Sequence, residues 1–251
     1  WPAFRRRSLG VLDMTAEPAE STSSPSLQVC RTCGGGAPVD VHFCPQCTKI
    51  LALGRHGDYF AFLGLPRKLR VDSDELDRNF RALSRQFHPD YFHNAPPAER
   101  RASLERSSYL NDAYRTLKDS SLRIEYLLEL EGLPAAGAAA GPGRAEPPPP
   151  ALLEEVFALN EELDAVRELR AGDPASADWR QRLDRARQPI DAKRVDHELE
   201  LHRLSSAWDD VLERGGDVAA RQHVLTALRA RMLERRYISN LLATIERELG
   251  C

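Results

Sequence analysis

A stretch of low complexity divides this chain and limits what either side of it can build. Residues 134–150 read PAAGAAAGPGRAEPPPP and contain no large apolar side chain. A segment of this composition contributes little to a packed core and is typical of a linker between domains. We therefore expect the 251 residues to form separate modules on the two sides of the linker rather than one large core.

The composition argues against several classes of protein. The chain has 42% hydrophobic and 29% charged residues, which is ordinary for globular proteins. Its net charge of -3 gives no general attraction to nucleic acid. It has no run of about eighteen apolar residues, so no membrane span is predicted. We expect no nucleic acid and no membrane among the partners.

The start of the chain admits two interpretations. Residues 1–13, which open with Trp1, are either translation upstream of a start at Met14 or an arginine-rich segment that resembles an organellar transit peptide. Transit peptides are poor in acidic residues, so the first interpretation is favoured by Asp13, Glu17 and Glu20. A cytoplasmic location is therefore expected, with the mitochondrial matrix as the alternative. Residues 1–28 are predicted to be a disordered lead-in.

Four of the five cysteines form two short pairs, Cys30-x-x-Cys33 and Cys44-x-x-Cys47. Each pair offers two thiolates from one tight turn, and two facing turns make the tetrahedral sulfur cage that zinc prefers. Because four cysteines leave no open coordination position, the zinc is expected to be structural. Redox chemistry at a single pair is the alternative, although the βαβ context of redox motifs is missing. Residues 29–50 are thus predicted to be a small zinc module.

Residues 57–133 show helical patterns. A short helix starts at Asp58 and ends before Pro66. A longer helix starts at Asp72 and ends at Pro89, and its apolar stripe consists of Leu76, Phe80, Leu83 and Phe87. A third helix opens at Pro96-Pro97 with a predicted stripe of Leu104, Leu110, Tyr114 and Leu117. The two longer helices are expected to pack as an antiparallel hairpin.

The turn of this hairpin reads His88-Pro89-Asp90, and three arginines project together from the helix that leads into it, namely Arg78, Arg81 and Arg85. A charge stripe alone is usually a solvated face. His88 and Asp90 could be taken for an acid–base pair, but no nucleophile or phosphate loop completes a catalytic site. We therefore expect that the protein is not an enzyme.

The short first helix, the basic second helix, the tripeptide and the segment Asn111-Asp112-Ala113-Tyr114 together resemble a J-domain over residues 58–118. The resemblance implies that the basic helix and the tripeptide dock on a DnaK-type chaperone and stimulate its ATP hydrolysis. The residues that it assigns to this contact are Arg78, Arg81, Arg85, His88, Pro89 and Asp90. A contact of this kind is expected to be steered by charge and sensitive to salt.

The rest of the chain resembles the HscB family of J-domain proteins. The resemblance rests on SLRIEYLL from Ser121, LLEE and LNEELD from Leu152 onward, and RYISNL from Arg236. It implies a co-chaperone that binds an IscU-type iron–sulfur scaffold and delivers it to an HscA/DnaK-type ATPase. A J-protein for other clients and a zinc-ribbon interaction adaptor are the alternatives. The long linker leaves the relative orientation of the two helical domains open.

Residues 151–251 are predicted to form a three-helix domain, with breaks at Gly172-Asp173-Pro174 and Gly215-Gly216. Its first helix carries a narrow apolar sector of Leu152, Val156, Leu159, Leu163 and Val166. This sector is expected to form a seam against Leu201, Leu204, Trp208, Leu212, Leu242, Ile245 and Leu249. The fold class is therefore all-α, with a small zinc module ahead of it.

Leu153 and Phe157 lie outside this sector, beside Glu154 and Glu161, and form an apolar strip edged by carboxylates. A broad core stripe, or packing under the linker, is the alternative explanation. The resemblance favours a scaffold-binding face, to which it adds Tyr237 of the last helix. Two residues depart from the family pattern and weaken this assignment, namely Glu154 and Ala158.

Overall fold

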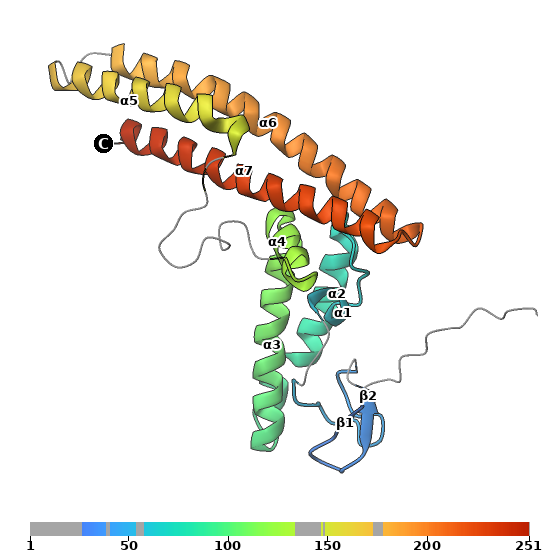
Figure 1. The fold of residues 1–251 in the computed structure, drawn as a ribbon. Coiled ribbons are helices and arrows are strands. Elements are labelled where there is room, and N and C mark those ends of the chain that lie inside the picture. Colours follow the sequence, from blue (N-terminus) through green and yellow to red (C-terminus); the bar gives the residue numbers. More distant parts are fainter. Residues whose placement is uncertain are drawn as a thin grey trace, which may run out of the picture.

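The computed structural model of the chain describes residues 27–38, 41–53, 58–133, 147, 149–172 and 178–250. Within these residues the fold is helical except for one two-stranded sheet, which confirms the predicted fold class. The sheet lies beside one end of a helical hairpin, and three further helices lie across the other end (Figure 1). None of the described helices is long and apolar enough to cross a membrane.

The sheet pairs β1 (Leu27–Val29) with β2 (Gly36–Pro38) in antiparallel register. Because β1 begins at Leu27, ordered structure starts earlier than the predicted end of the lead-in at residue 28. Three residues of alternation are too few to stand out as a strand in the sequence. Residues 1–26, including the segment around Met14, lie outside the described residues.

The hairpin is formed by α2 (Ser73–Phe87) and α3 (Pro97–Lys118) and is joined by a 3-10 turn, Pro89–Phe92. Short helix α1 (Tyr59–Phe62) packs against it, and α4 (Ser120–Leu130) follows. Asp72 caps α2 as predicted, since its carboxylate accepts hydrogen bonds from the amides of Asp74 and Glu75. The hairpin core includes Phe60, Leu63, Leu76, Phe87, Leu110 and Leu117.

The predicted apolar stripe of α3 was wrong at one residue. Leu104 is 58% exposed, and the buried face of the helix instead contains Ser103 and Arg106, both 0% exposed. Serine and arginine are usually found at the surface, so an apolar pattern passes over them. Here their polar atoms have partners, because Ser103 Oγ donates to the carbonyl of Phe87 at 2.6 Å and Arg106 Nε donates to that of Leu51 at 2.8 Å.

The C-terminal half contains α5 (Leu153–Gly172), α6 (Asp178–Glu213) and α7 (Val218–Gly250), preceded by a 3-10 turn at Pro150–Leu152. The breaks between the helices agree with the predicted ones, although Asp173 and Pro174 lie outside the described residues. Pro150 belongs to the 3-10 turn, so the predicted linker ends one residue earlier.

The predicted seam of this domain divides into two clusters. Of the five residues in the predicted sector, Val156 is half-buried and four are buried, namely Leu152 of the 3-10 turn and Leu159, Leu163 and Val166 of α5. They pack with Trp179, Leu183, Ile190, Ile238, Leu242 and Ile245. Leu201, Leu204, Trp208 and Leu212 do not contribute to this cluster and pack instead with Leu69, Ile124, Leu127, Leu128, Leu228 and Met232. The reason is length, because α5 has 20 residues against 36 in α6 and 33 in α7, so it covers only one end of the pair.

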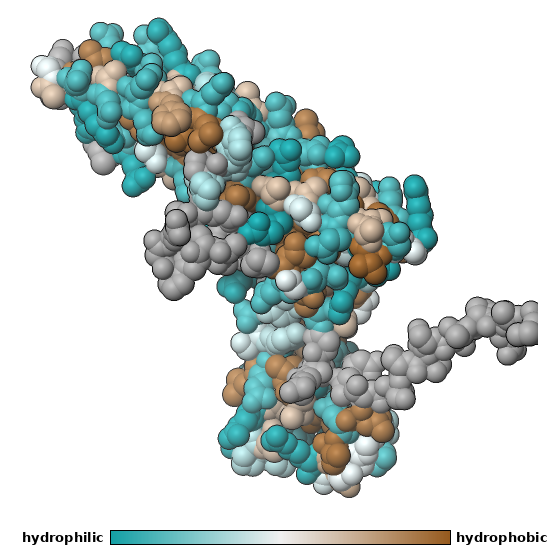
Figure 2. All heavy atoms as spheres, viewed as in Figure 1, coloured by the Kyte–Doolittle hydropathy of each residue, from teal (hydrophilic) through white to brown (hydrophobic). Residues whose placement is uncertain are grey.

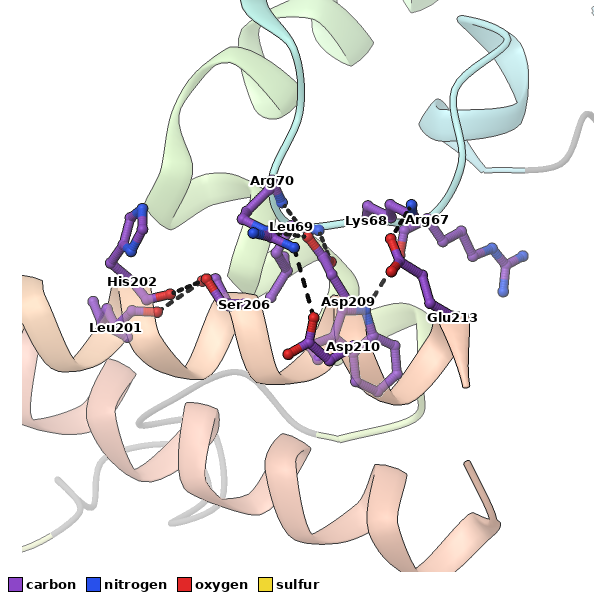
Figure 3. Close-up of polar contacts among 12 residues, drawn as sticks. Arg67, Lys68, Leu69, Arg70, Leu201, His202, Ser206, Asp209, Asp210 and Glu213 are labelled. Atoms are coloured by element: carbon purple, nitrogen blue, oxygen red, sulfur yellow. Dashed lines mark hydrogen bonds and ion pairs between the residues drawn. The ribbon is translucent and has the colours of Figure 1, made fainter. Parts of the chain in front are cut away.

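The uncovered end of the α6–α7 pair is occupied by α4 and by the loop between α1 and α2. Asp209 on α6 is completely buried and accepts hydrogen bonds from the amides of Leu69 at 2.7 Å and Arg70 at 2.9 Å (Figure 3). The indole of Trp208 donates to the carbonyl of Arg67 at 3.2 Å, and Lys68 pairs with Glu213 at the rim. These contacts define how the hairpin is oriented relative to the C-terminal helices, which the linker sequence left open.

Candidate functional site

The two cysteine pairs lie on two turns with the same backbone geometry. The amide of Gly34 donates to the carbonyl of Cys30, and the amide of Thr48 donates to the carbonyl of Cys44, both at 2.9 Å. The residue after each pair has a positive φ, 74° at Gly34 and 58° at Thr48. Each turn therefore directs its two thiols to one side of the backbone.

The four sulfur atoms converge at one point. All lie within 4.8 Å of one another, and the sulfurs of Cys30 and Cys47, like those of Cys33 and Cys44, are 3.7 Å apart. Zinc–sulfur bonds of ~2.3 Å in a tetrahedron require sulfurs roughly 3.8 Å apart. The predicted ligands thus come together at a spacing that fits a metal ion of the size of zinc.

The pKa values of the thiols also differ. The amides of Cys33 and Thr32 lower the pKa of Cys30 to about 6. The amide of Lys49 acts to lower the pKa of Cys47, but burial and the neighbouring thiols raise it to about 12. Four thiolates repel one another at this distance, and a bound cation would remove that repulsion.

The His-Pro-Asp turn lies at the end of the hairpin beside this module. His88 leaves the helical conformation, with ψ at 126°, and its Nδ1 accepts a hydrogen bond from the amide of Asp90 at 3.3 Å. The carboxylate of Asp90 is 86% exposed. The His88 ring therefore holds the turn locally, and the Asp90 carboxylate, 3.5 Å from the same ring nitrogen, remains accessible to a partner.

The three arginines of α2 are exposed, as a solvated or docking face requires. Arg81 lies 3.7 Å from Asp77 one helical turn away, a spacing and exposure at which ion pairs contribute little. Within the described part of the chain, Arg78 and Arg85 make no ion pair. The structure brings the three onto the helix that ends at the turn.

The predicted strip on α5 is accessible. Phe157 is 66% exposed and Leu153 37%, and Glu154 and Glu161 beside them are also exposed. Tyr237 differs, since it is half-buried and packs against the α5–α7 cluster. Over these helices Figure 2 shows scattered brown groups on a mostly teal surface. A groove of about 860 Å³ between α5 and α6 includes Glu154 on its wall.

Two residues near the turn were not predicted. Tyr91, in the 3-10 turn that includes Asp90, is 72% exposed and has its ring centre 6.0 Å from that of His88. An aromatic residue next to the tripeptide was a visible signal. Arg106, which joins α3 to the cysteine module, gave no signal because its partners are distant in the sequence.

Comparisons with known proteins agree with this geometry. Residues 58–126 match the DnaJ domain family. A co-chaperone protein HscB homolog of Vibrio cholerae is 38% identical over 123 residues, and the match spans 48% of this chain and 66% of the relative. The crystal structure of human co-chaperone protein HscB superposes with a TM-score of 0.62 at 25% identity, covering 88% of this chain and 98% of the human one. The structure of chaperone HscB from Vibrio cholerae superposes with a TM-score of 0.52 at 28% identity, covering 77% of this chain and 98% of the Vibrio chain. Together with the J-domain hairpin and the order of the following helices, they show that the chain belongs to the HscB family of J-domain proteins.

Proposed function

We propose that the protein is a co-chaperone for iron–sulfur cluster assembly, which stimulates an HscA/DnaK-type ATPase and delivers an IscU-type scaffold protein to it. The observation that carries this proposal is the exposed His-Pro-Asp turn at the end of the basic helix α2. The scaffold-binding strip lies on α5, at the other end of the molecule from the turn (Figure 1). One protein could therefore hold both partners at once.

The contact with the ATPase is electrostatic in this proposal. Arg78, Arg81 and Arg85 meet an acidic surface on the chaperone, while His88, Pro89 and Asp90 supply the specific contact at the tip. Charged groups at an exposed interface mainly raise the rate of association and are screened by salt. Binding is therefore expected to weaken as the salt concentration rises.

The scaffold contact is mixed in character. Leu153 and Phe157 supply apolar anchors, Glu154 and Glu161 edge them with negative charge, and Tyr237 closes the face from α7. A few apolar or aromatic side chains commonly carry most of the binding energy of an interface. The half-burial of Tyr237 means that its replacement would also loosen the α5–α7 packing.

Zinc is the metal proposed for the four-cysteine centre. Cys30, Cys33, Cys44 and Cys47 would hold it, and a site closed by four thiolates supplies fold stability rather than catalysis. The protein itself would have no ATPase or other enzymatic activity. Metal analysis of the purified protein and of Cys44→Ser checks this, since full zinc occupancy in the variant would contradict the assignment.

The deciding experiment measures ATP hydrolysis by the partner chaperone with and without the scaffold. His88→Gln and Asp90→Asn should each abolish stimulation while leaving the circular dichroism spectrum unchanged. Asp184→Asn, at an exposed position on α6, removes the same charge as Asp90→Asn and serves as its control. Undiminished stimulation by both turn variants would overturn the proposal.

Scaffold delivery is tested separately by calorimetry. Leu153→Ala and Phe157→Ala should each weaken scaffold binding by ~1–3 kcal/mol, the usual loss for an interface anchor. Val195→Ala replaces an apolar residue of α6 that is 52% exposed and should bind normally. If the protein stimulates the ATPase but binds no scaffold, it serves other clients.

A further inference from the structure

Phe87, the last residue of α2, lies directly before the His-Pro-Asp turn and is completely buried. Its ring is covered by the cysteine module, because the ring centre of His42 lies 5.0 Å away and that of Phe43 6.1 Å away. Phe62 of α1 packs at 6.0 Å. The ring that ends the basic helix thus depends on the module for part of its enclosure.

The backbone of Phe87 is held from the other side by α3. Ser103 Oγ and Ser107 Oγ both donate to its carbonyl oxygen, at 2.6 and 2.9 Å. Arg106 lies between these serines in the sequence, and its guanidinium is 5.6 Å from the centre of the Phe87 ring. One face of α3 therefore fixes both the carbonyl and the ring of this residue.

Arg106 also joins the hairpin to the module. Its Nε donates to the carbonyl of Leu51 at 2.8 Å, its Nη2 to that of Ala52 at 3.3 Å, and its Nη1 lies 2.7 Å from Nδ1 of His42. Burial lowers the pKa of Arg106 to about 10, which reflects how little water reaches the guanidinium. These hydrogen bonds compensate the buried charge only while the module is in place.

We propose that the cysteine module is a positioning element for the His-Pro-Asp turn, acting through His42 and Phe43 on Phe87 and through Arg106. This inference rests on the proposed function, since it assigns the module a part in ATPase stimulation. Figure 1 shows the module beside the turn end of the hairpin, away from α5–α7. A loop that is ordered before it binds loses less conformational entropy on binding.

The experiment uses the full chain with His42 and Phe43 both replaced by alanine. Hydrogen exchange at residues 86–92 should become at least severalfold faster. The concentration needed for half-maximal ATPase stimulation should rise by roughly two- to tenfold, which matches the ordering of one or two side chains. The maximal stimulation should remain, because His88, Pro89 and Asp90 are intact. Zinc content is measured in the same samples.

The control variant is Val29→Ala, which removes an apolar side chain that is 72% exposed on β1 and should change neither readout. If the alanine pair loses zinc or folds poorly, the same measurements are made on Arg106→Met. That variant breaks the same junction and changes no residue of the cysteine module. Unchanged exchange at the turn and unchanged half-maximal concentration would overturn the inference. Absence of stimulation by the unmodified protein would instead refute the proposed function, while the exchange measurement would still test the positioning.

Discussion

Thr48 has a backbone conformation that a β-branched residue rarely adopts. Its φ of 58° matches that of Gly34 in the other cysteine turn, where glycine has no side chain to clash. A non-glycine residue in this region is strained by roughly 1–2 kcal/mol. The Thr48 hydroxyl donates to the carbonyl of Cys47 at 2.7 Å, which offsets part of that strain.

Thr48→Gly is therefore expected to stabilise the cysteine module by about 0.5–1 kcal/mol, less than the full strain because glycine is more flexible when unfolded. The measurement is competition for zinc with a chelator, in which the variant should retain metal to a higher chelator concentration. Thr48→Ala keeps the strained conformation and loses the hydroxyl, so it should hold metal no better than the original. Equal retention in the glycine variant would show that Thr48 is not strained.

His197, on α6, is buried with no hydrogen-bond partner for either ring nitrogen within the described residues. The closest carboxylate oxygen, that of Glu234, is 3.6 Å from Nδ1. Burial lowers the pKa of His197 below 6.5, and Arg231 and Arg235 of α7 act in the same direction, whereas Glu234 opposes them. The folded protein therefore disfavours the protonated ring.

This predicts a loss of stability in acid. Above pH 6.5 the ring is neutral in both states, and below it the unfolded state takes up the proton first, so stability falls towards the lowered pKa of the folded state. His197→Leu should reduce the difference in unfolding free energy between pH 7.5 and pH 5.5, measured with urea. His202→Leu, at an exposed position on the same helix, should leave that difference unchanged. A parallel pH dependence in all three proteins would contradict the prediction.

Helix α3 shows that the buried face of a helix can include polar and charged residues beside apolar ones. Leu104→Ala should lower stability by less than ~0.5 kcal/mol because that side chain faces solvent. Leu110→Ala should lower it by ~2–5 kcal/mol, since Leu110 is 2% exposed in the hairpin core. Chemical unfolding of the two variants compares them directly, and similar losses would mean that the helix is rotated from the orientation described.

The α2 stripe was predictable because four apolar residues recur at helical spacing and the helix has a sequence-encoded cap. The His-Pro-Asp turn and the cysteine turns were equally readable, since each is made by neighbouring residues. Arg106 and Asp209 were not, because their partners Leu51 and Leu69 lie 55 and 140 residues away. The division of the C-terminal core into two clusters was not predictable either. It follows from the different lengths of α5, α6 and α7, and a helical wheel drawn for one helix does not compare helix lengths.

In the whole molecule, Asp209 of α6 binds the loop that leads into the hairpin, since its carboxylate accepts hydrogen bonds from the amides of Leu69 and Arg70. Asp209→Ala would leave the amides of Leu69 and Arg70 without their acceptor, at a loss of about 2–4 kcal/mol for hydrogen bonds to a buried charge. Small-angle scattering should then show a broader distribution of shapes, and amide exchange at residues 67–71 should accelerate. ATPase stimulation by the hairpin should persist.

Asp210→Ala is the matched control, since its carboxylate is 49% exposed and lies 3.8 Å from Arg70. It should lower stability by no more than ~0.5 kcal/mol, as expected for an exposed ion pair. If both variants scatter like the original protein, the other contacts of this junction, including those of α4, Trp208 and Lys68, are enough to maintain the orientation.

The position of α4 has a consequence for how the protein could be divided. This helix precedes the linker, yet Ile124, Leu127 and Leu128 pack in one cluster with residues of α6 and α7. The two halves of this cluster thus come from opposite sides of the segment 134–149. Two polypeptides, one ending and the other beginning within that segment, would carry complementary halves of the same core.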